Sequence, residues 1–351
     1  MVVPIQLAHP SSVAYDITID TLALPRYSRK VAVVTNPTVW GLHGPYLRER
    51  LQAEQIEIIE IPDGEEYKNL DTVVGILDRL FAARFERSDL LIAFGGGVIG
   101  DMTGFAASLY QRGIDFVQIP TTLLSQVDAS VGGKTGVNNR WGKNLIGAFH
   151  QPSAVHIDPH FLSTLPPREF AAGVAEVVKM AVMFDAAFFG YLEEHDLRDD
   201  AVIREMIRRS VTLKAEVVNQ DEKEAGIRAV LNYGHTFGHV IENETGYDTW
   251  LHGEAVAMGM VMANALAVRL GALSEEASER ITRLLERNGL PTHYTVADPE
   301  AFYEHFFLDK KSRAGRIRFV LPDGAIGTHR IRDDIDRESL LTVLATFGEK
   351  R

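Results

Sequence analysis

Four ionisable side chains in the second half of the chain have the types and spacing of a metal site. Glu176 lies in the segment AGVAEVVKMAV, His235 and His239 lie in LNYGHTFGHVIE, and His252 lies in LHGEAVAMGM. All three segments are predicted helices, and each places an ionisable group on or beside an apolar face, where a charge is costly without a partner. One carboxylate and two imidazoles are typical ligands of a catalytic Zn²⁺ that keeps one position open for substrate.

The spacing of these residues favours a shared site, although a structural role is the alternative for each one. His235 and His239 are four residues apart, and Glu176 and Lys179 are three apart, so each pair shares one face of its helix. A single helical histidine is more often packed or solvated than bound to a metal, and His252 also suits a solvent-exposed helix start. The segment HTFGH has no glutamate after its first histidine, which excludes the HExxH motif of metalloproteases.

A glycine-rich loop in the first half is a second candidate site. Residues 95–101, GGGVIGD, follow a predicted strand and open a predicted helix. Glycines let the backbone approach a pyrophosphate closely, and the helix start supplies N–H donors. The spacing differs from GxGxxG, so a tight packing turn is the alternative, but three consecutive glycines after a strand favour nucleotide binding. Just upstream, the acidic turn 63–68 either accepts hydrogen bonds from ribose hydroxyls or is solvated.

Residues 120–147 form a polar, glycine-rich run that is long for a plain connector. Such loops are often functional. This one carries Asp128, Lys134, Lys143 and Asn144, and lysines beside an asparagine can hold a phosphate or a carboxylate. The other interpretation is a flexible surface loop with solvated lysines.

The elements that must carry these residues change in type along the chain. In the first half, β-branched and apolar runs at 30–37, 56–64, 89–95 and 116–122 alternate with segments of helical spacing. Strands that alternate with helices predict a parallel sheet covered on both faces. From about residue 168 helical periodicity dominates, and a small hairpin is expected over 316–327. We therefore predict an α/β domain over 1–166 and a helical domain over 167–351.

Composition limits the classes of function. A chain of 351 residues is long enough for two domains with separate cores. The net charge of −12 and the lack of a basic stripe argue against nucleic-acid binding, and no apolar run is long enough to span a bilayer. The N-terminus does not resemble a signal peptide and cysteine is absent, which suits a cytoplasmic protein. An acidic protein that binds anions must gather its lysines and arginines locally.

Seven motifs, in order along almost the whole chain, resemble the sugar-phosphate cyclases, and most closely the 3-dehydroquinate synthases of the shikimate pathway. They are GGGVIGD, IPTTLLSQVDASVGGKTGVN, GKNLIGAFHQP, AGVAEVVKMA, LNYGHTFGHVIE, HGEAVAMGM and DKK. The resemblance implies a Rossmann-like α/β domain (1–166) that binds NAD⁺. It also implies an all-α C-terminal domain (167–351) that carries a divalent metal and the substrate.

The resemblance also implies a role for individual positions. Glu176, His235 and His252 match the ligands of Zn²⁺, which Co²⁺ can replace, and His239 matches a neighbouring proton-relay and phosphate-contact group. The positions that match the family's NAD contacts are Glu65, Lys68, Gly96, Gly97, Val98, Asp101, Thr121, Thr122, Leu124, Lys143, Thr164 and Leu165.

A second set of positions matches the family's substrate contacts. Its members are Asp128, Lys134, Asn144, Lys179, Lys214, Arg228, Asn232 and one lysine of the DKK triplet, either Lys310 or Lys311. In the family, an arginine that matches Arg112 reaches the substrate phosphate from the partner subunit, which implies a homodimer.

The family's reaction suits this set of residues. The substrate is 3-deoxy-D-arabino-heptulosonate 7-phosphate, a small anionic sugar. NAD⁺ oxidises its C5 hydroxyl, which the metal acidifies, and the ketone allows phosphate to be eliminated. NADH then returns the hydride, so no NAD⁺ is consumed, and an intramolecular aldol step gives 3-dehydroquinate. The substrate phosphate acts as the base in this family, so the protein mainly orients the substrate and holds its anionic groups.

Three alternative functions are weaker. Relatives that make 2-epi-5-epi-valiolone or 2-deoxy-scyllo-inosose differ at the residues that read the substrate, and Lys214, Arg228 and Asn232 favour a carboxylate-bearing substrate. A metal-dependent polyol dehydrogenase would not need the phosphate-binding segments VGGKTGVN and GKNLIG. A non-catalytic NAD- or metal-binding protein would be expected to lack one of the ligands or lysines, and none is missing.

Overall fold

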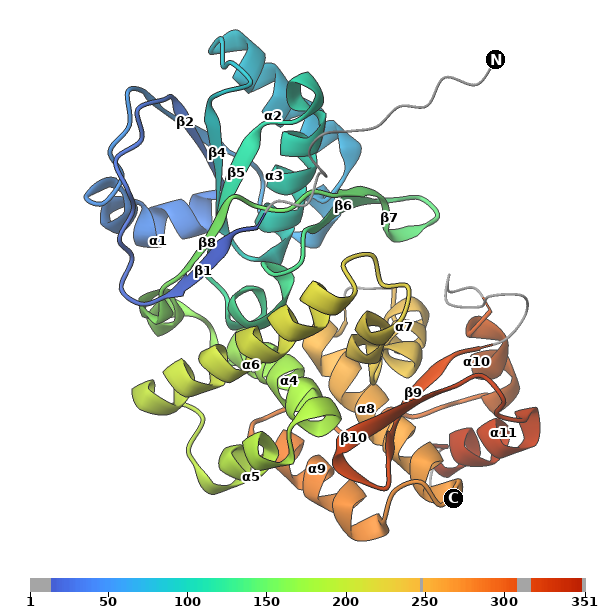
Figure 1. Cartoon of the computed structure of the whole chain (residues 1–351). Helices are drawn as coiled ribbons and strands as arrows, with labels where there is room; N and C mark the ends of the chain where they lie inside the picture. The colour runs from blue at the N-terminus through green and yellow to red at the C-terminus, as the bar shows by residue number, and fades with distance from the viewer. Residues whose placement is uncertain (1–13, 247–248, 308–316, 349–351) are drawn as a thin grey trace, which may run out of the picture. The chain divides into compact units, whose positions relative to one another are not determined.

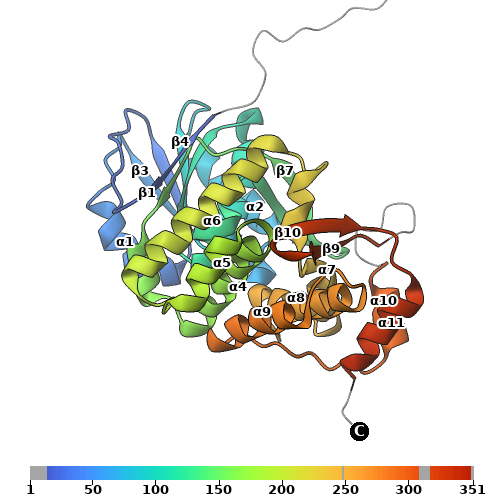
Figure 2. The same cartoon turned by 60° about the horizontal axis from the view of Figure 1, so that its bottom comes forward.

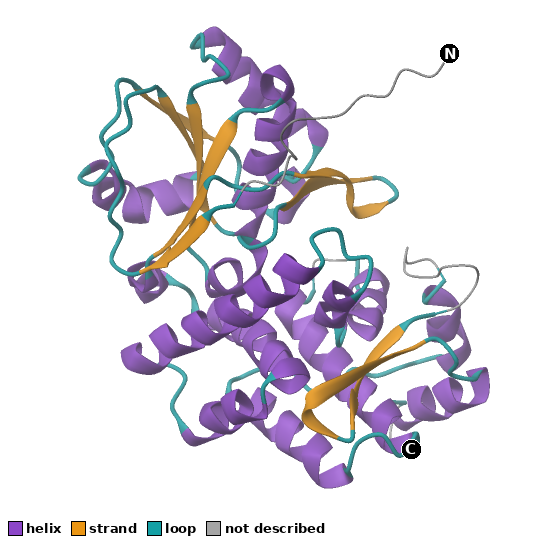
Figure 3. Cartoon of the chain, viewed as in Figure 1, coloured by secondary structure: helices purple, strands orange, loops and turns teal. Residues whose placement is uncertain are grey.

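The structure, a computed structural model, describes residues 14–246, 249–307 and 317–348 (Figure 1). The chain divides into two compact units. We call residues 14–120 with 133–158 the sheet unit, and residues 121–132 with the described residues from 159 to 348 the helical unit. Strands dominate the centre of the first and helices make up most of the second (Figure 3). Each unit is described by itself.

The sheet unit is built on six parallel strands in the order β1-β8-β5-β4-β2-β3. The strands are β1 (Asp16–Ile19), β2 (Val31–Thr35), β3 (Ile56–Glu60), β4 (Leu90–Gly95), β5 (Asp115–Pro120) and β8 (Ala154–Ile157). Every residue of β2 and β4 is buried, which explains why both read as unbroken apolar runs rather than alternating ones. The predicted parallel sheet is confirmed.

Three helices and a hairpin complete the sheet unit. They are α1 (Pro37–Arg48), α2 (Leu70–Ala82), α3 (Gly97–Leu109) and the antiparallel pair β6 (Lys134–Asn139) and β7 (Gly142–Phe149). Asn36 and Asn69 cap α1 and α2 by accepting hydrogen bonds from backbone N–H groups in the first turn. The hairpin packs on α3 at Gly104, where a methyl group would collide with the side chain of Thr135. Short 3₁₀ turns precede α2 (η1, Glu65–Tyr67) and follow α3 (η2, Tyr110–Arg112).

The helical unit is organised around α4, whose residues from Phe170 to Met183 are all buried. A helix that is apolar on every side belongs in the core of a unit. The other helices are α5 (Ala186–Glu194), α6 (Asp200–Gln220), α7 (His235–Glu244), α8 (His252–Arg269), α9 (Glu275–Arg287), α10 (Pro299–His305) and α11 (Arg337–Thr346). The helices α4 and α7 pack on α8, and the predicted late hairpin is present as β9 (Phe319–Asp323) and β10 (Ala325–Arg332) (Figure 2).

The division between the units differs in position from the predicted boundary at residue 166. It falls at residue 158, and residues 121–132 join the helical unit as well. In that segment η3 (Ser125–Ala129) packs on α4 and α6, and a methyl group on Gly173 would come within 2.6 Å of Leu123. The assignment of NAD to 1–166 and of metal and substrate to 167–351 stays a prediction.

Across the part of the chain that the structure describes, no helix combines the length and the hydropathy that a membrane span requires.

Candidate active site

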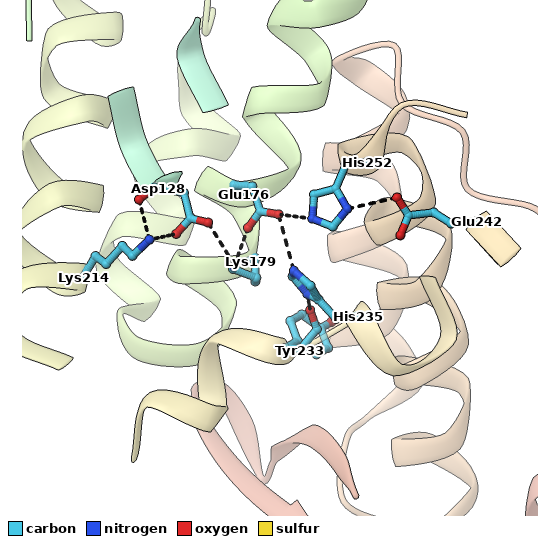
Figure 4. A network of polar contacts seen from close by, with 8 residues as sticks. All are labelled: Asp128, Glu176, Lys179, Lys214, Tyr233, His235, Glu242 and His252. Carbon is cyan, nitrogen blue, oxygen red and sulfur yellow. Dashed lines mark hydrogen bonds and ion pairs between the residues drawn. The ribbon is translucent and has the colours of Figure 1, made fainter. Parts of the chain in front are cut away.

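The three predicted metal ligands converge in the helical unit (Figure 4). Glu176 lies on α4, and His235 and His252 are the first residues of α7 and α8. Glu176 Oε1 lies 3.8 Å from His235 Nε2 and 3.6 Å from His252 Nε2. One ligand atom from each residue lies within 4.8 Å of the other two. Two ligands held tetrahedrally by zinc are about 3.4 Å apart, so this arrangement fits the ion.

The carboxylate at the centre of this cluster, that of Glu176, is buried and has an oxygen that a bound cation would neutralise. Glu176 is fully buried, and its Oε1 accepts no hydrogen bond. Its other oxygen, Oε2, forms an ion pair with Lys179, one turn along α4. A buried acceptor without a partner costs roughly 1–3 kcal/mol, more when it is charged. The face of Glu176 that points to the two imidazoles therefore suits a divalent cation.

Both imidazoles are set to offer Nε2 to a metal. His235 Nδ1 lies 3.1 Å from the carbonyl oxygen of Tyr233, and His252 Nδ1 lies 3.3 Å from Glu242 Oε1 (Figure 4). A ring that donates through Nδ1 keeps the Nε2 lone pair available for a ligand bond. The sequence reasoning missed Glu242. Its spacing was a usable signal, because seven residues after His235 is two turns further along the same helix face.

His239 lies beside these ligands. Its ring centroid is 5.6 Å from that of His235 and 6.3 Å from that of His252. It is not one of the three residues whose ligand atoms converge. This placement agrees with a role next to the metal rather than on it.

A close glycine contact and an ion pair between Arg168 and the buried Glu254 hold the ligand-bearing helices together. A methyl group on Gly253 would collide with the carbonyl of Ala172 on α4. Glu254 accepts two hydrogen bonds from Arg168, both 2.6 Å, and one from the backbone N–H of Leu251. The start of α8, which carries His252, is thus joined to the start of α4.

The start of α7 depends on glycine for its backbone shape. Gly234 precedes His235 with a φ of 79°, in the left-handed region that other residues avoid. A methyl group there would also come within 2.6 Å of the Met260 side chain and 2.8 Å of the Val256 carbonyl oxygen. His235 reaches the site because the chain can turn at this point.

A cluster of buried charges adjoins the metal ligands. Asp128 on η3 lies 2.6 Å from Lys214 Nζ and 4.0 Å from Lys179 Nζ, and both lysines are buried (Figure 4). Burial opposes the charge on Lys179, but the carboxylates of Asp128 and Glu176 outweigh it and raise its pKa. Burial lowers the pKa of Lys214, and the positive charges of Lys179 and Arg228 add to this effect against the attraction of Asp128.

Arg228 and Asn232 belong to the same unit. Arg228 is almost fully buried, and its guanidinium donates to the carbonyl oxygens of Glu222 and Gly132. Asn232 donates to the carboxylate of Glu224, whose charge also contributes to the raised pKa of Lys179. Glu224 was not among the predicted residues, and its position in a polar turn gave no signal in the sequence.

In the sheet unit, the glycine loop forms the turn from β4 into α3. Gly96 is the N-cap of α3 and supplies no side-chain hydrogen bond, so Gly97 and Val98 open the helix without a polar cap. A methyl group on Gly100 would come within 2.7 Å of the side-chain oxygen of Gln118 on β5. Helix starts of this kind bind anions well.

Four of the predicted NAD and substrate positions form one network in the sheet unit. Lys68 Nζ lies 2.6 Å from Asp101 Oδ2 and donates to Asn144 Oδ1 at 2.7 Å, whereas Glu65 accepts from Asn138. Burial opposes the charge on Lys68, but the carboxylates of Asp101 and Glu65 outweigh it and raise its pKa. Lys68, matched to NAD, and Asn144, matched to substrate, are thus in direct contact.

The remaining predicted positions are dispersed. Lys134 begins β6 and Lys143 lies on β7. Arg112 ends η2 with a φ of 69°. The helical unit contains Thr121, Thr122, Leu124, Thr164 and Leu165, whereas the glycine loop belongs to the sheet unit. Lys310 and Lys311 lie outside the described residues.

Comparison with known proteins decides the family. A model of the 3-dehydroquinate synthase N-terminal region matches residues 58–172, and a model of its C-terminal region matches residues 173–312. The chain belongs to the 3-dehydroquinate synthase family. The 3-dehydroquinate synthase of Sulfurovum sp. (strain NBC37-1) is 68% identical over 100% of both chains.

Solved structures extend this likeness to the fold. The 2-epi-5-epi-valiolone synthase of Streptomyces hygroscopicus subsp. jinggangensis 5008, solved with NAD⁺ and Zn²⁺ bound, has a TM-score of 0.87 and 30% identity, covering 97% of this chain and 99% of its own. A 2-deoxy-scyllo-inosose synthase solved with carbaglucose-6-phosphate, NAD⁺ and Co²⁺ has a TM-score of 0.81 and 24% identity, covering 94% and 96%. The predicted 3-dehydroquinate synthase fold, with a Rossmann-like α/β part and a helical part, is confirmed.

Proposed function

We infer that the protein is an enzyme that converts 3-deoxy-D-arabino-heptulosonate 7-phosphate to 3-dehydroquinate and phosphate, in the biosynthesis of aromatic amino acids. One observation carries this inference. The convergence of Glu176, His235 and His252 beside buried lysines occurs in a chain that is 68% identical, over its full length, to a protein named 3-dehydroquinate synthase. NAD⁺ and a divalent metal are the cofactors.

Glu176, His235 and His252 would hold Zn²⁺, with Co²⁺ as a substitute. The ion supplies Lewis acidity to a substrate hydroxyl, and NAD⁺ supplies a reversible hydride acceptor. The protein's own part begins with Lys179, which neutralises Glu176 Oε2 and leaves Oε1 facing the two imidazoles. His239, beside both rings, is placed to move a proton.

Buried cations suit the anionic substrate. Lys179, Lys214 and Arg228 bring three positive groups into one region, where Asp128 pairs with both lysines and Glu176 pairs with Lys179. Burial and its cationic neighbours disfavour the charge on Lys214, so a bound carboxylate or phosphate would stabilise it. We propose that Arg228 and Asn232 hold the carboxylate end, which favours a carboxylate-bearing sugar over a neutral one.

The sheet unit is suited to the nucleotide. The uncapped start of α3 supplies N–H donors for a pyrophosphate, and Glu65 lies on the turn η1 that precedes α2. The buried Lys68, two residues before the start of α2, forms an ion pair with the half-buried Asp101 on α3. We propose that these groups contact NAD⁺.

A homodimer is the proposed assembly. Leu70, Val74 and Phe81 are exposed and lie on one face of α2, at intervals of four and seven residues, and Leu109 of α3 is exposed as well. The ring of Phe81 packs 4.7 Å from that of Tyr110, two residues before Arg112. A second copy that covered this apolar surface would bring its Arg112 with it.

The proposed function is tested with purified protein, NAD⁺, Zn²⁺ and the heptulosonate phosphate. Equal release of phosphate and 3-dehydroquinate without net NADH is the expected result. NADH accumulation from a plain polyol would instead indicate a dehydrogenase, and phosphate release from a sugar phosphate without a carboxylate, but not from the heptulosonate phosphate, would indicate another cyclase. His235→Ala should abolish turnover and lower the bound zinc. Normal phosphate release with normal zinc in that variant would refute the metal assignment.

A further inference from the structure

Asn138 links the two parts of the sheet unit that carry the proposed cofactor and substrate contacts. It lies on β6 where the register with β7 shifts between Val137 and Asn139. At such an irregularity a residue leaves the regular ladder and can direct its polar groups elsewhere. The backbone N–H of Asn138 donates to the carbonyl oxygen of Lys68 at 2.8 Å.

Both ends of its side-chain amide are also used. Asn138 Nδ2 donates to Glu65 Oε1 at 2.8 Å, and Asn138 Oδ1 accepts from the backbone N–H of Asn144 at 2.8 Å. No carboxylate could make both contacts, because one requires a donor and the other an acceptor. The position therefore selects an amide.

The residue held by this contact has an unusual backbone. Asn144 has a φ of 53°, in the left-handed region, where asparagine is tolerated better than most residues. Its side-chain Oδ1 accepts from Lys68 Nζ. Backbone and side chain of Asn144 are thus fixed from two sides, by Asn138 and by Lys68.

These contacts, with the hydrogen bond from the backbone N–H of Lys68 to the carbonyl oxygen of Glu65, close a ring of four residues. Glu65 begins η1 and Lys68 follows it, Asn138 and Asn144 lie on the two strands of the hairpin, and hydrogen bonds join the two pairs. Lys68 continues the ring to Asp101 on α3. A displacement of η1 is therefore transmitted to Asn144.

We propose that Asn138 is a positioning residue that joins the NAD-contacting turn to the substrate-contacting hairpin, so that NAD⁺ and the sugar phosphate each strengthen the binding of the other. The proposal rests on the proposed function for the identity of the two ligands. The coupling is reciprocal by thermodynamic necessity. If NAD⁺ raises the affinity for the substrate by some factor, the substrate raises the affinity for NAD⁺ by the same factor.

The first test removes the side chain. Asn138→Ala deletes two hydrogen bonds, so the KM for the heptulosonate phosphate should rise roughly tenfold, and the Kd for NAD⁺ severalfold, while kcat changes less than about twofold. Asn139→Ala is the matched control, because the Asn139 side chain only accepts from the backbone N–H of Trp141 at the hairpin tip. Its constants should stay within about twofold of wild type. Unchanged KM and Kd in Asn138→Ala would overturn the proposal.

The second test exchanges the pair instead of deleting it. Asn138→Asp places a carboxylate opposite Glu65 and should raise KM more than Asn138→Ala does. In a Glu65→Gln background the donor and acceptor are reversed, so the same substitution should change KM less than about threefold relative to Glu65→Gln alone. An equal effect in both backgrounds would refute the contact.

The two tests also separate this proposal from the proposed function. Absence of turnover in the wild type would refute the proposed function. The Kd of NAD⁺ could still be measured by direct binding without substrate. The effect of Asn138→Asp on this Kd in the wild-type and Glu65→Gln backgrounds would show whether Asn138 and Glu65 act as a pair.

Discussion

At the scale of single residues, Glu242 contacts the imidazole of His252, a proposed metal ligand. Glu242 is buried, and its carboxylate lies 3.3 Å from His252 Nδ1. A carboxylate in this position fixes the tautomer and raises the basicity of the imidazole. Glu242 acts through His252. A change at Glu242 should therefore alter the affinity for the metal directly and turnover only as a consequence.

We expect Glu242→Ala to weaken zinc binding about 10–100-fold, because outer partners of a ligating histidine typically contribute that much. Glu242→Gln should recover part of the loss, since its amide oxygen still accepts from Nδ1–H. The measurement is competition for Zn²⁺ with a chromogenic chelator. Glu244→Ala is the control on the same helix, because Glu244 contacts Tyr294 and His305 instead. Equal zinc affinity in wild type and Glu242→Ala would contradict the assignment.

The types of the ligands could be predicted from the sequence, but their outer partners could not. Glu176, His235 and His252 are ionisable side chains on apolar helices, which is an uncommon pattern in a sequence. The structure brings the three together. Glu224 and Asn138 look like ordinary surface polar residues, because their contacts join segments that only the fold brings close. Lys68 and Asn144 were predicted separately for the same reason.

At the scale of elements, the metal site depends on how closely α8 approaches α4. Gly253 directly follows His252 and lies against the Ala172 carbonyl, four residues before Glu176. An added methyl group has no flexible side chain to displace there, only backbone. Separation of the two helices is the expected response.

Gly253→Ala should therefore destabilise the protein by about 1–3 kcal/mol or more and lower its zinc content. Gly190→Ala on α5 is a matched control, since no atom lies within 4 Å of the position of the added methyl group. Replacement of that mid-helix glycine should stabilise the protein by about 0.5–1 kcal/mol. Urea unfolding and zinc analysis check both. Normal stability and zinc content in Gly253→Ala would show that the helix contact is unimportant.

His156 on the strand β8 should make the free energy of unfolding depend on pH. Burial lowers the pKa of His156, and its Nδ1 makes no hydrogen bond. The folded pKa lies below the unfolded value of about 6.5, so below pH 6.5 the unfolded state binds more protons and stability falls. His156→Gln should flatten the loss of stability between about pH 6.5 and the folded pKa. Urea unfolding at several pH values measures it, and parallel curves for wild type and variant would contradict it.

The strands and helices themselves were largely predictable, because period and β-branching report burial directly. The fully buried β2 and β4, the buried stretch of α4 from Phe170 to Met183 and the late hairpin follow from local patterns. The assignment of residues 121–132 to the helical unit does not follow from a local pattern. Leu123 is buried against Gly173 of α4, a helix that begins more than forty residues later, and no local pattern encodes that contact.

At the scale of the whole molecule, three buried positive side chains are grouped in one unit although the net charge of the chain is negative. The chain carries a net charge of −12, yet Lys179, Lys214 and Arg228 are all buried in one unit. The sequence predicted such a local group of cations as an anion-binding site. The grouping is present, and the binding of an anion stays a prediction. Arg112 belongs to the sheet unit, as do Lys68, Lys134 and Lys143. It follows the exposed Leu109 by three residues and Tyr110, whose ring packs on the exposed Phe81, by two.

The proposed dimer makes a prediction that a monomer cannot satisfy. If Arg112 serves the partner's site, Arg112→Ala and His235→Ala are each inactive alone, but a mixed dimer holds one site with neither defect. Co-expression in equal amounts should restore about a quarter of wild-type activity, because about half of the dimers are mixed and one of their two sites is intact. Phosphate release from the co-purified protein is the measurement.

The control pairs two defects within one site. Lys179→Ala and His235→Ala both alter groups that surround Glu176 of the same chain. A mixed dimer of these variants also has two sites, but each chain carries a defect in its own site, so co-expression should restore nothing. Failure of the Arg112→Ala pair to exceed this control would place Arg112 in its own chain's site or outside any site. Recovery in that pair alone would require that two copies of the chain share the chemistry.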